Sequence, residues 1–169
     1  MSHAAHTDDI KTLGEKIKDI RIAMLTTQSD DGTLRSRPMA TQEMEFDGDL
    51  WFFTYASTPK VEEVKQDQHI NLSYAKPDDN LYVSVSGTAN LVRDPQKMKE
   101  LWKPILKTWF PKGLEDPDLA LLKVSVTKAE YWETNAGTVQ ILAGFVKAAV
   151  TGKQADIGEN KKLDLQHGA

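Results

Sequence analysis

The chain contains no cysteine among its 169 residues, which excludes disulfide bonds, thiolate nucleophiles and cysteine-ligated metals. Its four histidines are scattered over the sequence, so we expect no metal site: they are His3, His6, His69 and His167. Neither sign of charge dominates, because 21 lysines and arginines face 25 acidic residues for a net charge of −4. The basic surface that nucleic acid binding usually requires is therefore missing.

Long apolar runs and a secretory signal are also missing, so we predict a cytoplasmic protein that does not enter membranes. There is no Gly-x-Ser-x-Gly turn, which disfavours a serine hydrolase. Four acidic residues alternate around a predicted turn: Glu43, Glu45, Asp47 and Asp49. They leave a glycosidase-like carboxylate pair open, although charges on an exposed hairpin face are the more ordinary interpretation.

What the sequence does contain is enough apolar material for one core. Hydrophobic residues make up 40% of an 18.9 kDa chain, which favours a single domain over residues 1–169. We expect an ordered core at about residues 7–152 and a polar C-terminal tail at 153–169. The tail is rich in lysine and glutamine, which predicts disorder.

Hydrophobic periodicity predicts a mainly β protein with peripheral helices. Apolar residues at helical spacing predict a first helix capped at residues 7–9, a helix over 94–109 bent at Pro104, and a last helix over 139–150. Extended or alternating patterns predict the strands 22–27, 33–40, 50–55, 70–74, 81–91 and 122–132. The second and third of these strands are expected to form a hairpin through an Asp47-Gly48 turn. Six or more mostly antiparallel strands would close into a small β-barrel.

The segment from residue 35 to residue 60 contains the most chemistry. Thr58 is a favourable N-cap and Pro59 suits the first position of a short helix, which places Lys60 in its first turn. An anion such as a phosphate would be stabilised there by the free N–H groups, the helix dipole and the ammonium. The alternative is that Lys60 is a solvated surface charge paired with Glu62 or Glu63, and the local pattern does not decide between the two.

Several short motifs, taken in order, resemble one known family. They are RIAMLTT at 21–27, the turn at 31–32, RSRPM at 35–39, FFT at 52–54, STPK at 57–60 and AEYW at 129–132. Together they resemble the FMN-binding split β-barrel superfamily of the pyridoxamine 5′-phosphate oxidases, and most closely its general stress protein branch. The resemblance implies a six-stranded antiparallel split barrel and a homodimer with FMN, or alternatively FAD, at the subunit interface.

The resemblance also implies a set of cofactor-binding residues. Arg37, Thr58 and Lys60 match phosphate-binding positions, and Trp132 matches a tryptophan that reaches the flavin of the partner subunit. Tyr82, Trp109 and Trp132 also have an ordinary interpretation as packing residues. The full set of candidates is Arg35, Ser36, Arg37, Pro38, Met39, Thr54, Ser57, Thr58, Lys60, Tyr82, Trp109 and Trp132.

Other parts of the family pattern are absent from the sequence. Pyridoxamine-phosphate oxidases hold the substrate phosphate with a tyrosine, an arginine and a serine on the helix after the central strand, and with an arginine–histidine pair after the tryptophan. Residues 98–104 and 134–138 contain neither set. Vitamin B6 oxidation is therefore not expected.

Three functions stay open at this point. The first, which we favour, is an FMN-binding stress protein with oxidoreductase activity on an unidentified small molecule. The second is a non-catalytic protein that sequesters or senses flavin, because phosphate contacts establish binding and not chemistry. The third is a split barrel that holds haem or another ligand, for which His69 is the sole candidate axial ligand. No catalytic residue is assigned.

Overall fold

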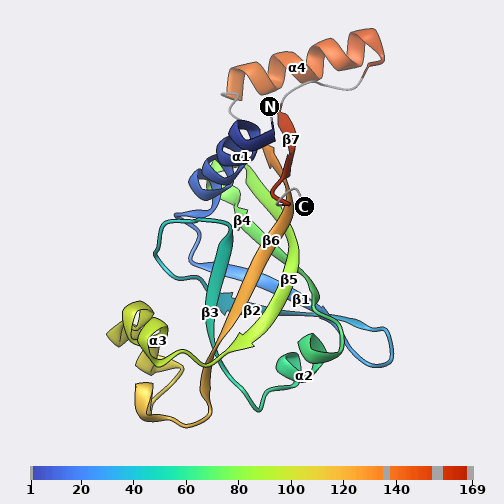
Figure 1. The fold of residues 1–169 in the computed structure, drawn as a ribbon. Helices are drawn as coiled ribbons and strands as arrows, with labels where there is room; N and C mark the ends of the chain where they lie inside the picture. The colour runs from blue at the N-terminus through green and yellow to red at the C-terminus, as the bar shows by residue number, and fades with distance from the viewer. Residues whose placement is uncertain (1, 135–137, 154–157, 167–169) are drawn as a thin grey trace.

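The computed structural model describes residues 2–134, 138–153 and 158–166 and contains one antiparallel sheet with helices around it (Figure 1). The mainly β fold class is thereby confirmed. The strands are β1 (Ile22–Gln28), β2 (Leu34–Ala40), β3 (Asp49–Tyr55), β4 (His69–Lys76), β5 (Leu81–Val92), β6 (Leu119–Glu133) and β7 (Glu159–Asp164).

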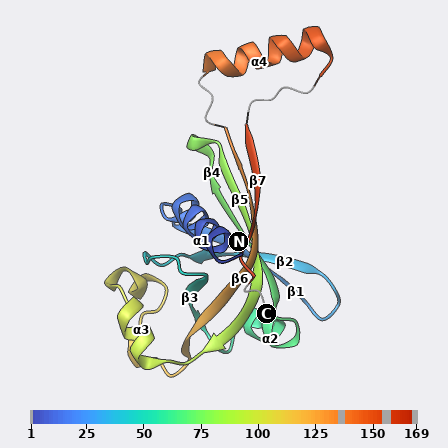
Figure 2. The same ribbon diagram turned by 45° about the horizontal axis from the view of Figure 1, so that its top comes forward.

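The sheet curls into a half-barrel that stays open along one line. Its strand order is β2-β1-β4-β5-β6-β3, with β7 added to the far side of β6. The two ends of this path, β2 and β3, approach each other without forming a ladder. This opening is the split in a split β-barrel, and two views show the sheet curling around it (Figures 1 and 2).

The predicted hairpin between β2 and β3 is wrong. β3 pairs instead with β6, where Phe52 lies opposite Leu122 and Phe53 opposite Leu121. β6 begins with four consecutive buried residues at 119–122, so both of its faces are apolar there. The two phenylalanines of β3 point to opposite faces of the sheet, and each therefore has an apolar neighbour on β6. Residues 41–48 therefore form a loop that leads from one edge of the opening to the other.

The core lies inside the curl. On β5 the alternate residues Leu81, Val83, Val85 and Ala89 are buried, which confirms the predicted period of two. At Gly87 the ladder with β6 has a bulge, and a Cβ atom there would lie 2.3 Å from the backbone oxygen of Ser125. Only glycine allows the two strands to approach so closely at this point.

The helices lie around the half-barrel: α1 (Ser2–Ile17), α2 (Pro59–Gln66), α3 (Pro95–Leu101) and α4 (Thr138–Thr151). The predicted start of α1 at a cap over residues 7–9 is wrong, because the helix already begins at Ser2. The long helix expected over 94–109 is also wrong: α3 ends before Trp102, and a separate 3₁₀ turn occupies Pro104–Thr108. Pro104 breaks the helix instead of bending it, because proline lacks the N–H that would continue the ladder.

The polar tail does not match the expectation of disorder in its described part. β7 pairs with β6 from Lys128 to Glu133, and Leu163 and Leu165 are buried, each at most 3% exposed. Two leucines at a spacing of two are enough to seat the strand against the core. The assignment of the whole chain to one domain stays a prediction.

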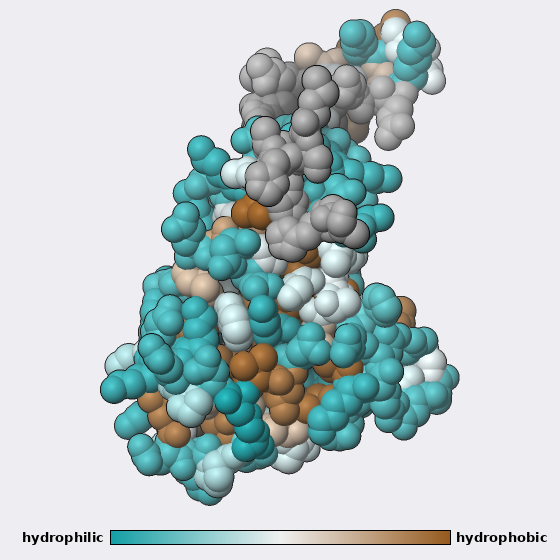
Figure 3. Space-filling model, in the orientation of Figure 1, coloured by the Kyte–Doolittle hydropathy of each residue, from teal (hydrophilic) through white to brown (hydrophobic). Residues whose placement is uncertain are grey.

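The surface is mainly polar, with apolar side chains in brown gathered on the lower half of the face in Figure 3. Helix α4 projects beyond the barrel, and its Phe145, Val146 and Val150 are exposed. No helix in the described part of the chain is long and apolar enough to cross a membrane. Within the same residues, no group of three or more acidic or histidine side chains is placed to hold a metal.

Candidate functional site

A cavity of 250 Å³ opens between the unpaired edges of β2 and β3. Five of the predicted site residues line it: Pro38, Met39, Thr54, Lys60 and Trp109. The remaining lining residues are Ile22, Ala40, Gln42, Phe53, Tyr55, Leu106 and Phe110. The cavity therefore combines apolar and aromatic walls with one cationic side chain.

Lys60 is half-buried in the first turn of α2, beside this cavity. Burial lowers the pKa of Lys60, the nearby charge of Arg37 lowers it further, and Glu63 partly opposes both. Among the described residues no carboxylate oxygen lies within 4.0 Å of its ammonium, since Glu62 pairs with Lys65 and Glu63 with Arg37. The interpretation of Lys60 as a paired surface charge is therefore wrong.

Glu63, which the sequence alone suggests only as a partner for Lys60, is a buried acid beside the site, at 6% exposure. Its carboxylate accepts hydrogen bonds from the hydroxyls of Thr27 and Ser29 and from the guanidinium of Arg37, with Nη2 to Oε2 at 2.8 Å. Burial alone would raise the pKa of Glu63, but these hydrogen bonds and the Arg37 charge outweigh it, so the pKa lies below its ordinary value. The sequence signal that could have identified Glu63 is the pair Arg35 and Arg37 at alternate positions of one strand. Two neighbouring positive charges favour a nearby acidic partner.

The guanidinium of Arg37 is held in a fixed orientation by two neighbouring side chains. Its Nη1 donates to Thr27 and its Nη2 to Glu63, which leaves other N–H groups of its fork available. Arg35, two residues away on the same strand face, is more exposed and reaches Glu63 at 3.3 Å. Ser36 points to the other face, where its hydroxyl lies 2.7 Å from that of Thr26.

The hydroxyls at the start of α2 have partners in the protein. Thr58 is the N-cap residue as predicted, but its side chain donates to the Tyr55 carbonyl oxygen at 2.8 Å and does not cap the helix. Thr54 is 1% exposed, and its hydroxyl lies 3.5 Å from that of Thr58. Ser57 is turned away, because its N–H and hydroxyl both bond to Asp118. Thr54 therefore lines the cavity with Thr58 next to it, whereas Ser57 anchors the loop.

Tyr82 and Trp132 are not part of this cavity within one chain. They are opposite each other on β5 and β6, on the outer side of the sheet, and are 46% and 43% exposed. Neither of them lines the cavity between β2 and β3. Two large neighbouring aromatic side chains at this exposure form an apolar patch on the outside of the barrel.

Comparison with known proteins agrees with this architecture. The family model described as pyridoxamine 5′-phosphate oxidase like matches residues 8–156. The chain belongs to this family. It is also 31% identical to protein bli-3 of Neurospora crassa, over 96% of this chain and 86% of that protein.

Solved structures of family members carry the same fold. General stress protein 26 from Jannaschia sp. CCS1 superposes with a TM-score of 0.70 at 26% identity, covering 95% of this chain and 99% of the other. The general stress FMN/FAD binding protein of Xanthomonas citri superposes with a TM-score of 0.67 at 26% identity, over 78% of this chain and 92% of that one. The chain is thus a pyridoxamine 5′-phosphate oxidase-like split barrel of the general stress protein type.

The donor chemistry of the cavity fits the flavin phosphate that this family implies. Lys60, which lines the mainly apolar cavity, offers an unpaired ammonium, and Arg37, whose charge acts on Lys60 from outside the lining, offers further N–H donors. A haem ligand does not fit, because His69 is exposed, lies outside the cavity and has a ring nitrogen 2.8 Å from Asp67. The acidic residues raised as a glycosidase pair are also engaged, Glu43 with Lys103 and Asp49 with Lys123.

Proposed function

We propose that this protein binds FMN in the opening between β2 and β3, with the flavin phosphate at Lys60 and Arg37. The observation that carries the proposal is Lys60, a half-buried cation with no carboxylate partner among the described residues. A buried charge without a partner is unfavourable, and a bound anion removes that penalty. The N-terminal end of α2, which begins at Pro59, adds a favourable interaction of the helix dipole with an anion.

The chain's own residues would hold and orient the flavin. Glu63 fixes the guanidinium of Arg37, so that its remaining N–H groups are preorganised for phosphate oxygens. Met39, Trp109 and Phe110 line the same cavity as Lys60 and supply apolar walls, as the flat part of a flavin requires. When bound, FMN supplies the redox chemistry, and the protein tunes it through hydrogen bonds and local charge.

The proposal includes a homodimer in which a second copy completes each site. Its support is the patch of Tyr82 and Trp132, which is exposed in one chain and lies outside the cavity. Isologous dimers are the commonest oligomers, and two such patches would be covered in one interface. We further propose that the protein acts in the cytoplasm, which accords with its lack of cysteine.

We favour oxidoreductase activity on a small molecule, since a hollow of about 670 Å³ adjoins the cavity through Ile22, Leu106 and Trp109 and offers space for a substrate. The test is the visible absorption spectrum of protein purified without added cofactor, and again after FMN addition and desalting. Flavin bands in either sample support the proposal, and a colourless protein that retains no FMN overturns it. Repeating the loading with FAD shows which flavin is preferred.

Anaerobic addition of NADH or NADPH then separates turnover from simple binding. Bleaching of the bound yellow flavin supports a redox role. Persistent colour with both reductants, when free flavin and a known reductase respond normally, supports the alternative of a flavin-sequestering protein. Neither outcome affects the assignment of the phosphate site, which depends on the binding measurement alone.

A further inference from the structure

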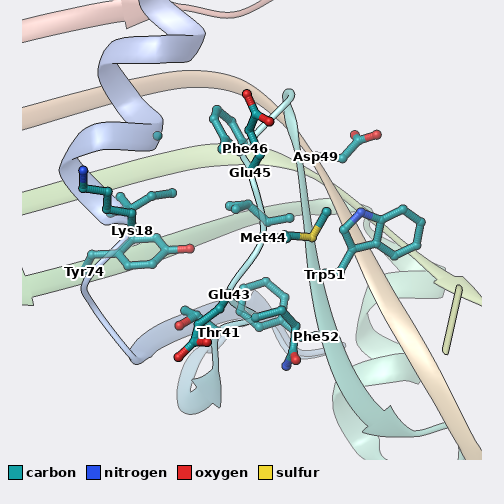
Figure 4. Close-up of a pocket in the computed structure, with 14 residues that line it drawn as sticks. Lys18, Thr41, Glu43, Met44, Glu45, Phe46, Asp49, Trp51, Phe52 and Tyr74 are labelled. Atoms are coloured by element: carbon teal, nitrogen blue, oxygen red, sulfur yellow. The ribbon is translucent and has the colours of Figure 1, made fainter. Parts of the chain in front are cut away.

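A second cavity, of about 360 Å³, lies between α1 and the start of β3 (Figure 4). It is enclosed by α1, by the loop of residues 41–48 and by the start of β3. Phe52 lines this cavity, whereas its neighbour Phe53 lines the flavin site, because successive side chains of a strand point to opposite faces. The volume is within the range of small-molecule sites.

The walls of this cavity are mainly apolar. Ile17 and Phe52 are buried, and Met44, Phe46 and Trp51 are half-buried around the opening. The loop closes on α1 at Gly14, where a Cβ atom would lie 3.3 Å from the Cβ of Phe46. Glycine at this position allows the phenylalanine to pack directly on the helix.

One polar group in this cavity has no partner. Tyr74 on β4 is 1% exposed, and its hydroxyl has no hydrogen-bond partner in the described part of the chain. In Figure 4 the ring extends from beside α1 and its oxygen points into the cavity. Burial raises the pKa of Tyr74, so the phenol is a neutral donor. Buried hydroxyls are almost always hydrogen-bonded, so the unpaired hydroxyl of Tyr74 indicates a position where a further molecule supplies the acceptor.

The charged side chains around the opening are already neutralised. Asp49 accepts from Ser125 and pairs with Lys123, both at 2.8 Å. Glu43 pairs with Lys103, and Lys18 pairs with Glu15 at 2.7 Å. The remaining charge at the rim, Glu45, is exposed to solvent. Nothing inside the cavity therefore selects a charged ligand.

We propose that this cavity is a second ligand site, which binds an uncharged aromatic molecule through a carbonyl or similar oxygen that accepts a hydrogen bond from Tyr74. The aromatic and apolar walls supply most of the contact, and the single phenol fixes the orientation. The site is distinct from the flavin site: Gln42 is the one lining residue that the two cavities share, and neither Lys60 nor Arg37 lines the second cavity.

The test uses prodan, a neutral fluorescent naphthalene with a propionyl carbonyl, titrated into the purified full-length protein. We expect saturable binding with a blue-shifted emission and quenching of tryptophan fluorescence, because Trp51 lines the cavity. Tyr74→Phe removes only the hydroxyl and should weaken binding by about fivefold to tenfold. Dimethylnaphthylamine, which lacks the carbonyl, should bind wild type and Tyr74→Phe equally.

Two controls locate the probe. Met44→Trp fills the opening from the loop and should abolish binding, whereas Lys60→Ala and excess FMN should leave prodan affinity unchanged. Circular dichroism and thermal melting establish that each variant is folded. Absence of prodan binding to wild type, an affinity unaffected by Tyr74→Phe, or displacement of prodan by FMN would each overturn the proposal. In those cases a trapped water is the partner of Tyr74, or the probe sits in the flavin site.

Discussion

Arg37 on β2 and Glu63 on α2 form an ion pair of 2.8 Å between residues 26 positions apart in the sequence. The carboxylate is buried and also accepts from Thr27 and Ser29, so β1, β2 and α2 meet at one acid. This pair holds the guanidinium close enough to Lys60 for its charge to lower the pKa of the lysine. Three elements of the candidate flavin site therefore depend on a residue outside the family motifs that the sequence displayed.

Replacement of this acid is the first prediction. Glu63→Gln should lower the free energy of unfolding by about 2 to 4 kcal/mol, because it leaves the Arg37 charge poorly paired. The matched control is Glu62→Gln on the same helix, whose exposed pair with Lys65 should contribute within about 0.5 kcal/mol. Urea denaturation followed by tryptophan fluorescence measures both. Equal stabilities for the two variants would contradict the proposed role of Glu63.

Acid stability should depend on the same residue. The folded-state pKa of Glu63 lies below its ordinary value of 4.5, so its stabilising effect is complete above 4.5 and is lost as the pH falls through the lower folded-state value. The melting temperature of wild type should therefore fall more steeply below pH 4.5 than that of Glu63→Gln. Melting curves measured from neutral pH down to the onset of acid unfolding show this. Parallel curves would mean that another carboxyl governs acid unfolding.

Lys60→Ala should weaken FMN binding at least tenfold, or about 1.4 kcal/mol, because the ammonium is the unpaired cation of the cavity. Lys65→Ala is the control, since Lys65 lies on the same helix and pairs with Glu62 at 2.7 Å. Titration of FMN fluorescence with each variant measures the dissociation constants. An unchanged FMN affinity in Lys60→Ala would show that the flavin phosphate does not bind at Lys60.

Trp132→Ala should change the visible absorption or fluorescence of bound flavin without unfolding the protein. The side chain is 43% exposed in one chain, so its loss removes little core packing. Trp132→Phe keeps an aromatic ring and should restore part of the spectrum. Sedimentation velocity on wild type and variant reports whether the proposed dimer forms and whether the substitution alters it. A large loss of thermal stability with an unaltered flavin spectrum would identify Trp132 as a packing residue.

The C-terminal strand should contribute to stability. Leu163→Ala removes a side chain that is 2% exposed opposite Ala129 and should cost about 2 to 4 kcal/mol of unfolding free energy. Lys161→Ala, on the same strand with an exposed side chain, should change stability by less than about 0.5 kcal/mol. Thermal and urea unfolding compare the two. A Leu163→Ala protein as stable as wild type would mean that β7 adds nothing to the fold.

Local patterns in the sequence determined the individual elements. Strict alternation over residues 81–91 predicted β5, and Thr58-Pro59 predicted the start of α2 with Lys60 in its first turn. These features depend on neighbours in the chain, through side-chain periodicity and the fixed φ of proline. The family motifs added the split barrel, which the structure confirms.

Only the tertiary structure decided which elements meet. It paired β3 with β6 in place of β2, seated β7 through Leu163, and made Glu63 the counter-ion of Arg37. It also left the hydroxyl of Tyr74 without a partner in the described part of the chain. Each of these outcomes joins residues far apart in sequence, where the gain from burial and from paired charges depends on the whole arrangement and leaves no trace in local propensity.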